Sequence, residues 1–266
     1  ADGVELYFES LGEGTPIIFQ AHDHTPWLFF QAPVFSQRYR VVTYDRRGTG
    51  RSASPPGDWS AADLARDLVG LLDALGIERA IIAGSSLGGV VTAQFGVDHP
   101  DRALGLVIGH TVPYLDRHGR EWLEAEIRTA LEGRPAIQRQ PRSDDGESEG
   151  PPTTDPAFAA SPLGRMVAST GTGLGRTPGD IARAIAVLRD WDQRPAKPEL
   201  ARLRVPTLVI VGEREPRLTI DGAREWATWI PGAEFAILPG AHHAAPREAA
   251  AAWNATVLGF LDRSGL

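Results

Sequence analysis

Short apolar runs that alternate with segments of helical spacing constrain the fold of this chain more than any other feature. Four of these runs are almost continuously apolar and lie at residues 41–44, 80–83, 104–108 and 207–211. Continuous apolar runs are typical of parallel strands that are covered on both faces. Between the first two runs, leucines recur at helical spacing from Leu64 to Leu75, after Ser60 as a suitable N-cap. Strand–helix–strand alternation predicts an α/β fold with a doubly wound, mostly parallel sheet.

Three further runs complete the predicted sheet. Residues 4–8 and 16–21 are expected to form two strands around a turn at Gly12 and Gly14, and residues 235–238 form the last strand.

The alternation breaks between residues 112 and 200. Amphipathic stretches around Trp122 and Ile185 predict helices, and residues 133–161, rich in Pro, Gly, Asp, Glu and Ser, predict a long mobile loop. A helical insertion in an α/β sheet usually sits over the carboxyl ends of the strands, where ligands bind. We therefore predict a sheet core of residues 1–111 and 201–266 with a helical cap, or lid, of residues 112–200.

Composition excludes several classes of function. The chain has no cysteine, which removes disulfides, thiolate nucleophiles and cysteine metal ligands. Its net charge of −7, without a basic stripe, argues against nucleic acid as a partner. No apolar stretch approaches the roughly 18 residues of a membrane span, and no signal-peptide pattern opens the sequence. We therefore expect a cytoplasmic protein that does not enter a membrane. Oligomeric state cannot be predicted from this sequence.

The strongest local motif follows the apolar run at residues 80–83. Gly84-Ser85-Ser86-Leu87-Gly88 is a G-x-S-x-G sequence between a predicted strand and a predicted helix, which is the context that makes this motif a nucleophile elbow. Only Ser86 has a glycine two residues away on both sides, so Ser86 is the candidate nucleophile. The alternative is a glycine-rich turn with an idle serine.

A serine hydroxyl needs a base, and that base needs an orienting acid. His243 follows the last predicted strand, and Glu215 follows the buried run at residues 207–211. The carboxyl ends of parallel strands meet at one edge, so both side chains are expected there. The chain order Ser86, Glu215, His243 agrees with the Ser…Asp/Glu…His order known for one such fold. Glu213 and Asp116 remain rival acids.

With these residues in place, the chain resembles the α/β-hydrolase fold family, in particular its esterase, lactonase and haloperoxidase-like group. Residues 45–52 resemble the family's D-x-R-G-x-G-x-S loop, and residues 205–212 resemble its V-P-T-L-x-x-x-G strand. The resemblance implies the α/β-hydrolase fold, with Ser86 as nucleophile, His243 as general base and Glu215 as the acid, where most members have Asp.

The resemblance also locates an oxyanion hole, and the chain departs from the family there. By position, the hole uses the backbone N–H groups of Asp23 and Leu87. The family usually has His-Gly at the end of the preceding strand, whereas this chain has His22, Asp23 and His24, and His242 replaces the usual glycine before the catalytic histidine.

The remaining candidates are residues that bind substrate. We expect His22, His24 and His242 to form a polar cluster that lines the pocket, with Trp27 and Trp122 as apolar lining. A zinc site built from the same histidines is the alternative, but it gives the serine elbow no purpose, so no metal is predicted. The glycines of residues 171–175 follow no strand, so they do not predict a nucleotide site, and no cofactor is expected.

These observations lead to one function and two rivals. We predict a cofactor-independent serine hydrolase that cleaves a small, largely apolar carboxylic ester or lactone through an acyl-enzyme. The first rival keeps the fold but hydrolyses a C–C bond, or performs a lyase or cyclase reaction with His243 and the pair His22 and His24 as acid–base groups. The second rival is a non-catalytic ligand receptor.

Overall fold

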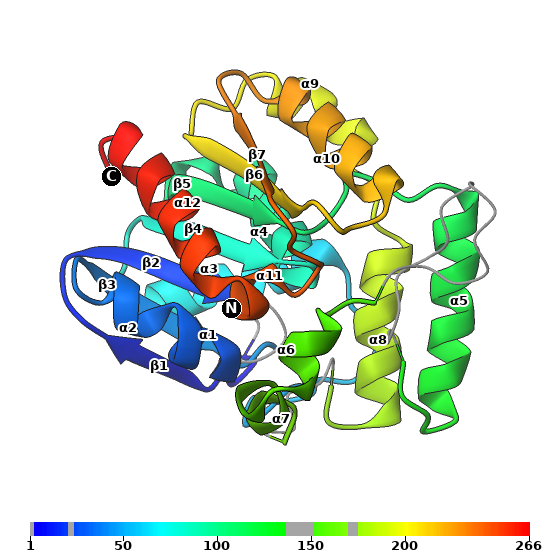
Figure 1. Cartoon of the computed structure of the whole chain (residues 1–266). Helices are drawn as coiled ribbons and strands as arrows, with labels where there is room; N and C mark the ends of the chain where they lie inside the picture. The colour runs from blue at the N-terminus through cyan, green and yellow to red at the C-terminus, as the bar shows by residue number, and fades with distance from the viewer. Residues whose placement is uncertain (1–2, 21–23, 137–151, 170–174) are drawn as a thin grey trace.

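A computed structural model describes residues 3–20, 24–136, 152–169 and 175–266. Its centre is a seven-stranded sheet (Figure 1). The strands are β1 (Phe8–Leu11), β2 (Thr15–Gln20), β3 (Tyr39–Tyr44), β4 (Ala80–Ser85), β5 (Ala103–Gly109), β6 (Thr207–Gly212) and β7 (Glu234–Leu238). Their order across the sheet is β1-β3-β2-β4-β5-β6-β7. All neighbouring pairs are parallel except β1 with β3, which confirms the predicted mostly parallel sheet.

The first strand differs from its prediction in position and in partner. β1 begins at Phe8 and pairs with β3 rather than with β2 across the turn at Gly12 and Gly14. The preceding residues bond instead to a loop, because the Tyr7 carbonyl accepts from the Asp45 N–H and the Glu5 carbonyl accepts from the Ala53 N–H. Two strands do flank the turn at Gly12 and Gly14, but the first begins at Phe8 instead of residue 4, and the two strands do not pair with each other.

Helices cover both faces of the sheet. One face carries α3 (Ala61–Ala74), α4 (Leu87–Asp98) and α10 (Arg217–Trp229). The other carries α1 (Thr25–Phe30), α2 (Ala32–Phe35), α11 (Ala245–Glu248) and α12 (Ala250–Arg263). Short segments η1 (Pro100–Arg102), η2 (Arg194–Ala196) and α9 (Lys197–Leu200) connect them. The α3 helix begins after Ser60, whose side chain accepts from the Asp63 N–H, so the predicted N-cap is confirmed.

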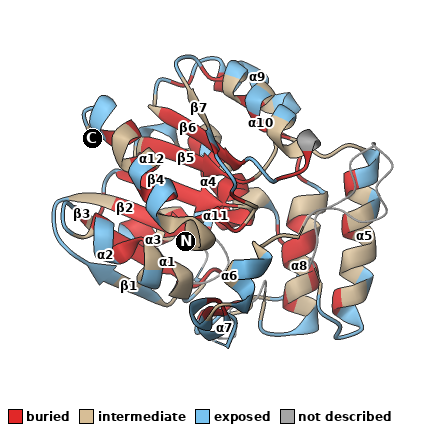
Figure 2. Cartoon of the chain, viewed as in Figure 1, coloured by how far each residue is buried: buried red, intermediate tan, exposed pale blue. Residues whose placement is uncertain are grey.

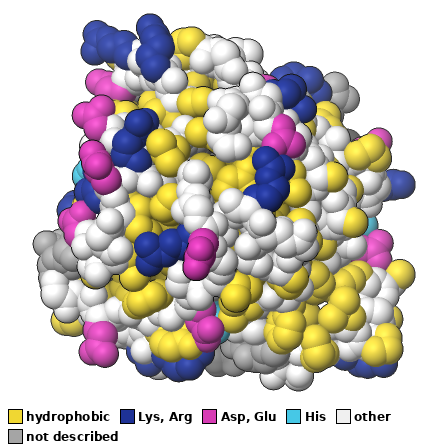
Figure 3. Space-filling model, turned by 90° about the vertical axis from the view of Figure 1, so that its left-hand side faces the viewer, with side chains coloured by type: hydrophobic (Ala, Val, Ile, Leu, Met, Phe, Trp, Pro, Cys, Tyr) yellow, Lys and Arg dark blue, Asp and Glu magenta, His cyan; other side chains and the backbone are white. Residues whose placement is uncertain are grey.

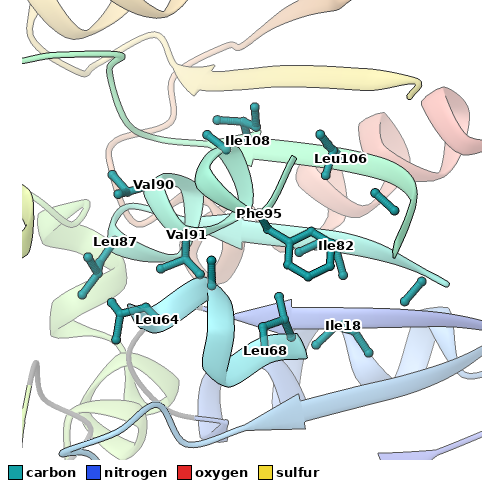
Figure 4. Packing of buried hydrophobic residues seen from close by; sticks show 14 of the residues in the cluster. Ile18, Leu64, Leu68, Ile82, Leu87, Val90, Val91, Phe95, Leu106 and Ile108 are labelled. Atoms are coloured by element: carbon teal, nitrogen blue, oxygen red, sulfur yellow. The ribbon is translucent and has the colours of Figure 1, made fainter. Parts of the chain in front are cut away.

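Alternating side chains of each strand enter two separate apolar layers. In β4, Ile82 packs toward α3 and α4, whereas Ile81 belongs to the layer under α12. Figure 4 shows the first layer, in which Leu64 and Leu68 of α3 meet Val91 and Phe95 of α4 above the sheet. These strands are buried on both faces, which explains why their sequences are continuously apolar.

The helical insertion lies between β5 and β6. It contains α5 (Arg117–Leu131), α6 (Pro156–Ala160), α7 (Pro162–Ser169) and α8 (Pro178–Arg189). The α6 helix falls inside the segment predicted to be a loop, because Asp155 accepts from the Phe158 N–H and so caps a helix there. Residues 137–151 of that predicted loop lie outside the described residues, as do most of the glycines at residues 171–175. The domain limits at residues 112 and 200 stay a prediction.

Burial differs between these parts. Figure 2 shows that the central strands are buried, whereas α5 and α8 carry many intermediate and exposed positions. On the face shown in Figure 3, Lys and Arg side chains are interspersed with Asp and Glu among hydrophobic residues. Of the helices in the described ranges, none is long and apolar enough to cross a bilayer.

Candidate active site

Ser86 occupies a sharp turn between β4 and α4. Its φ of 58° and ψ of −120° are outside the regions that side-chain-bearing residues usually adopt. A Cβ on Gly84 would lie 2.1 Å from the Gly88 carbonyl oxygen, so the first glycine of the motif is required by this close approach. Ser85 is buried, with 7% of its surface exposed, whereas Ser86 is partly exposed. The turn therefore presents the serine that the motif indicates.

Neighbouring strands hold this turn in place. The Ser86 N–H donates to the Gly109 carbonyl at the end of β5, at 2.9 Å. Leu87 is the first residue of α4, so its N–H has no acceptor within the helix and lies at the positive end of the helix dipole. This is the Leu87 donor that the resemblance assigns to an oxyanion hole.

A buried polar chain connects the elbow helix to the end of β2. The Tyr44 hydroxyl donates to Gln20, the Gln20 amide donates to Thr92 at 3.0 Å, and the Thr92 hydroxyl donates to the Gly88 carbonyl at 2.9 Å. Burial is the largest cause that raises the pKa of the Tyr44 hydroxyl above its usual value, so the hydroxyl remains a donor. These bonds keep α4 in register with the strand that precedes residues 21–23.

Glu215 and His243 meet at the same edge of the sheet. Glu215 lies three residues after β6, and its Oε2 is 2.9 Å from Nδ1 of His243, which follows β7. The Glu215 side chain is fully buried, while 23% of the His243 side chain is exposed. The Gly212 N–H also donates to Glu215 Oε1 at 2.9 Å. The carboxylate is thus held by backbone and faces a histidine that remains accessible.

The environment of Glu215 favours its charged form. Burial by itself raises the pKa of this carboxyl, but the electrostatic interactions and hydrogen bonds with His110 and His243 outweigh burial. The result is a Glu215 pKa well below its usual value. Glu215 therefore carries a negative charge throughout the neutral pH range.

The two rival acids have other partners. The Glu213 carboxylate accepts from the Gly240 N–H at 2.7 Å and lies at the surface. Asp116 is the N-cap of α5, where it accepts from the Gly119 N–H at 2.7 Å. Among the three candidates, Glu215 is the carboxylate that contacts His243.

His24 contacts the loop that follows β3. Its Nδ1 lies 2.6 Å from Asp45 Oδ1, and its backbone N–H donates to the same oxygen at 3.1 Å. The His24 ring also packs beside Tyr7. The buried Asp45 carboxylate thus holds His24 through both donors, and a role for His24 in binding substrate stays a prediction.

The other predicted substrate-binding residues are dispersed. Trp27 is only 2% exposed and stacks on Phe19 in the core. Trp122 packs against the small apolar cluster between α5 and α8. The His242 ring lies 3.4 Å from Glu248, and its backbone N–H donates to that carboxylate. His22 and Asp23, including the predicted Asp23 oxyanion donor, lie outside the described residues.

One residue of the site was missed in the sequence. His110 follows β5 directly, and its Nδ1 lies 2.7 Å from Glu215 Oε1. A histidine at the carboxyl end of a buried apolar run was the available signal, and it is the same signal that indicated His243. In the described part of the chain, no group of three or more His, Cys, Asp or Glu side chains is arranged to hold a metal ion.

Comparison with known proteins shows the family of this chain. A model of the alpha/beta hydrolase fold family matches residues 21–248. This chain belongs to the α/β-hydrolase fold family.

Individual relatives and structures carry different names. The chain is 28% identical to a protein of Azorhizobium caulinodans named "Putative carbamate hydrolase RutD", over 96% of this chain and 94% of that protein. It is 25% identical to the enol-lactonase of Burkholderia xenovorans LB400, with a TM-score of 0.82 and 98% of both chains covered. A thermophilic esterase of Thermogutta terrifontis is also 25% identical, with a TM-score of 0.79 and coverage of 98% and 94%. The fold is shared along the whole chain, and the named reactions are those of the relatives.

Proposed function

We propose that this chain is a cofactor-independent serine hydrolase that cleaves a carboxylic ester or lactone. His243 removes the proton of Ser86, and Ser86 attacks the substrate carbonyl to form an acyl-enzyme. His243 then activates water, which releases the acid and restores the serine. The proposed substrate is a small, largely apolar molecule.

The contact between Glu215 and His243 carries this proposal. A carboxylate only accepts hydrogen bonds, so the imidazole donates from Nδ1 to Glu215. The other ring nitrogen, Nε2, is then free to accept the proton of the nucleophile. The charged Glu215 also stabilises the imidazolium that forms in this step, because the two groups are only 2.9 Å apart in a buried environment.

Charge that develops on the carbonyl oxygen needs donors that are already in place. The Leu87 N–H at the start of α4 supplies one, and we propose the Asp23 N–H as the second. The elbow geometry supports the first donor because Ser86 and Leu87 are consecutive. The second donor rests on the family resemblance alone.

The rival functions predict different reactivity. C–C bond hydrolysis and lyase or cyclase chemistry keep the acid–base groups but do not need an acyl-enzyme on Ser86. A ligand receptor keeps the fold but turns over no substrate. The name of the relative in Azorhizobium caulinodans adds a carbamate to the compounds that need testing, since a carbamate carbonyl can be attacked by the same serine.

A pair of serine variants tests the proposal. Ser86→Ala should lower kcat on a panel of aryl esters, lactones and carbamates by up to about 10⁶-fold, as expected for loss of a triad nucleophile. Ser85→Ala is the matched control, since the buried neighbour should retain most of the activity. Full activity in Ser86→Ala together with an inactive Ser85→Ala would overturn the assignment. Wild-type protein that turns over no member of the panel would favour the receptor or lyase alternatives.

A further inference from the structure

His110 stands in an unusual backbone conformation beside the catalytic group. It is the residue after β5, its φ is 55°, and its side chain has no exposed surface. The His110 N–H donates to the Ile210 carbonyl of β6 at 2.8 Å, while the preceding residue, Gly109, accepts from Ser86. A non-glycine residue with positive φ persists only where its surroundings hold it, and such residues gather at functional sites.

The contacts of Glu215 show what this conformation achieves. Oε1 of Glu215 lies 2.7 Å from Nδ1 of His110, and Oε2 lies 2.9 Å from Nδ1 of His243. The centroids of the His110 and His243 rings are 6.1 Å apart, and the rings are nearly perpendicular to each other. One buried carboxylate therefore joins two histidines, with one oxygen directed to each. The reaction described above uses only His243.

We propose that His110 is a positioning residue of this hydrolase, which holds the Glu215 carboxylate so that Oε2 faces His243. This inference rests on the proposed function. The Gly212 N–H fixes Oε1 from the strand side, and His110 fixes the same oxygen from the end of β5. With Oε1 held twice, the carboxylate cannot rotate about its terminal bond without breaking both interactions.

His110 also moderates how strongly Glu215 acts on His243. A carboxylate only accepts, so His110 must donate its Nδ1–H to Oε1. That donation lowers the negative potential that Glu215 presents to His243, whether or not His110 is charged. His110 and His243 are the charged or titratable side chains that act on Glu215 from the packed elements. Loss of the His110 donor should therefore favour protonated His243 and move the acid limb of the pH–activity profile to higher pH.

Two substitutions at position 110 separate the effect of the hydrogen-bond donor from the effect of the strained backbone. Asparagine and glycine both tolerate a positive φ at position 110. The asparagine amide nitrogen is as many bonds from the backbone as Nδ1 of histidine, so His110→Asn keeps a donor for Glu215. His110→Gly has none. If His110→Gly does not fold, His110→Leu, which fills the buried volume without a donor, takes its place.

The experiment measures kcat and the pH dependence of kcat/KM for ester hydrolysis. We expect His110→Gly to lower kcat on the order of 10²-fold, the loss associated with a misplacement of about 1 Å. Its acid limb should move up by roughly 0.5–1 pH unit. His110→Asn should recover most of both changes. His99→Gly is the control, because it removes a histidine that packs on Phe95 at the far end of α4.

Three results would overturn the role of His110. The first is an unchanged kcat in His110→Gly. The second is a loss of kcat in His110→Gly without movement of the acid limb, which is what a purely structural change would give. The third is a His110→Asn variant whose kcat and acid limb are no closer to wild type than those of His110→Gly. Failure of the proposed function looks different, since wild-type protein would then hydrolyse no ester, lactone or carbamate and would not react with a fluorophosphonate at Ser86.

Discussion

The sheet and the helical insertion differ in how extensively they are packed. The sheet is packed between two extended apolar layers, and the residues that follow its strands form the candidate site. The α5 and α8 helices share a small apolar cluster centred on Leu123, Ala130 and Ile185. The insertion is attached to the rest of the chain in two ways. Ala184 and Val187 of α8 belong to the first apolar layer. In addition, the Ser54 hydroxyl donates to Asp180, and the Arg176 N–H donates to the Gly48 carbonyl at 2.9 Å.

Glu248 joins the insertion directly to the loop of His243, the proposed general base. The buried Glu248 carboxylate accepts from the backbone N–H groups of His242 and Asp155, both at 2.5 Å. His242 precedes His243, and Asp155 caps α6. The sheet edge that carries the candidate site is thus fixed mainly by apolar packing, whereas polar contacts add to a smaller apolar contact in positioning the insertion beside it.

The largest expected effect concerns the sheet edge. Glu215→Gln should lower kcat by roughly 10³–10⁴-fold, because an amide neither fixes the tautomer of His243 nor stabilises its charged form. Steady-state kinetics on an aryl ester give the measurement. Glu213→Gln is the matched control, with a carboxylate at the surface of the same loop. A larger loss of kcat in Glu213→Gln than in Glu215→Gln would identify Glu213, and not Glu215, as the acid that orients His243.

A pair of isoleucines compares the stability of the two regions. Ile82 of β4 and Ile185 of α8 are both fully buried, the first in the sheet layer and the second in the small cluster. Ile82→Ala should lower the free energy of unfolding by about 4 kcal/mol and Ile185→Ala by about 2 kcal/mol, within the range for buried isoleucine, because α8 can relax toward the cavity. Denaturant unfolding measures both. Equal losses would show that the insertion is packed as firmly as the sheet.

The smallest expected effect concerns the contact between the insertion and the histidine loop. Glu248→Gln removes one of two acceptor oxygens, so KM should rise by about tenfold, the equivalent of about 1.4 kcal/mol, with a smaller change in kcat. Glu121→Gln, on the exposed surface of α5, should leave both parameters unchanged. If Glu248→Gln changed only the melting temperature, the contact would stabilise the fold without positioning the site.

Much of the sheet could be predicted because its strands are buried on both faces. Continuous apolar runs predict such strands, and six of the seven observed strands overlap the predicted runs closely. β1 was misplaced because it is an edge strand with an exposed burial pattern and a partner distant in sequence. Short range patterns carry no information on that pairing.

The site divides in a similar way. The sharp turn at Ser86 could be predicted because the glycine spacing is local, and the meeting of Glu215 and His243 because each follows a buried run. The sequence could not exclude Asp116 as the acid, because the hydrogen bond by which Asp116 caps α5 was not predicted. The pairing of His24 with Asp45 was not predicted because it joins segments that are distant in the sequence. His110 was missed because its partner lies 105 residues away and no motif surrounds it.

Covalent labelling tests the central claim most directly. The wild-type protein is incubated with a fluorophosphonate, digested, and the modified residue identified by mass spectrometry, with Ser86→Ala and Ser85→Ala treated in parallel. The proposed mechanism predicts a single modified serine, Ser86, in wild type and in Ser85→Ala, and no modification in Ser86→Ala. Modification at Ser85, or ester hydrolysis that continues while Ser86 stays unmodified, would contradict a serine nucleophile at this elbow.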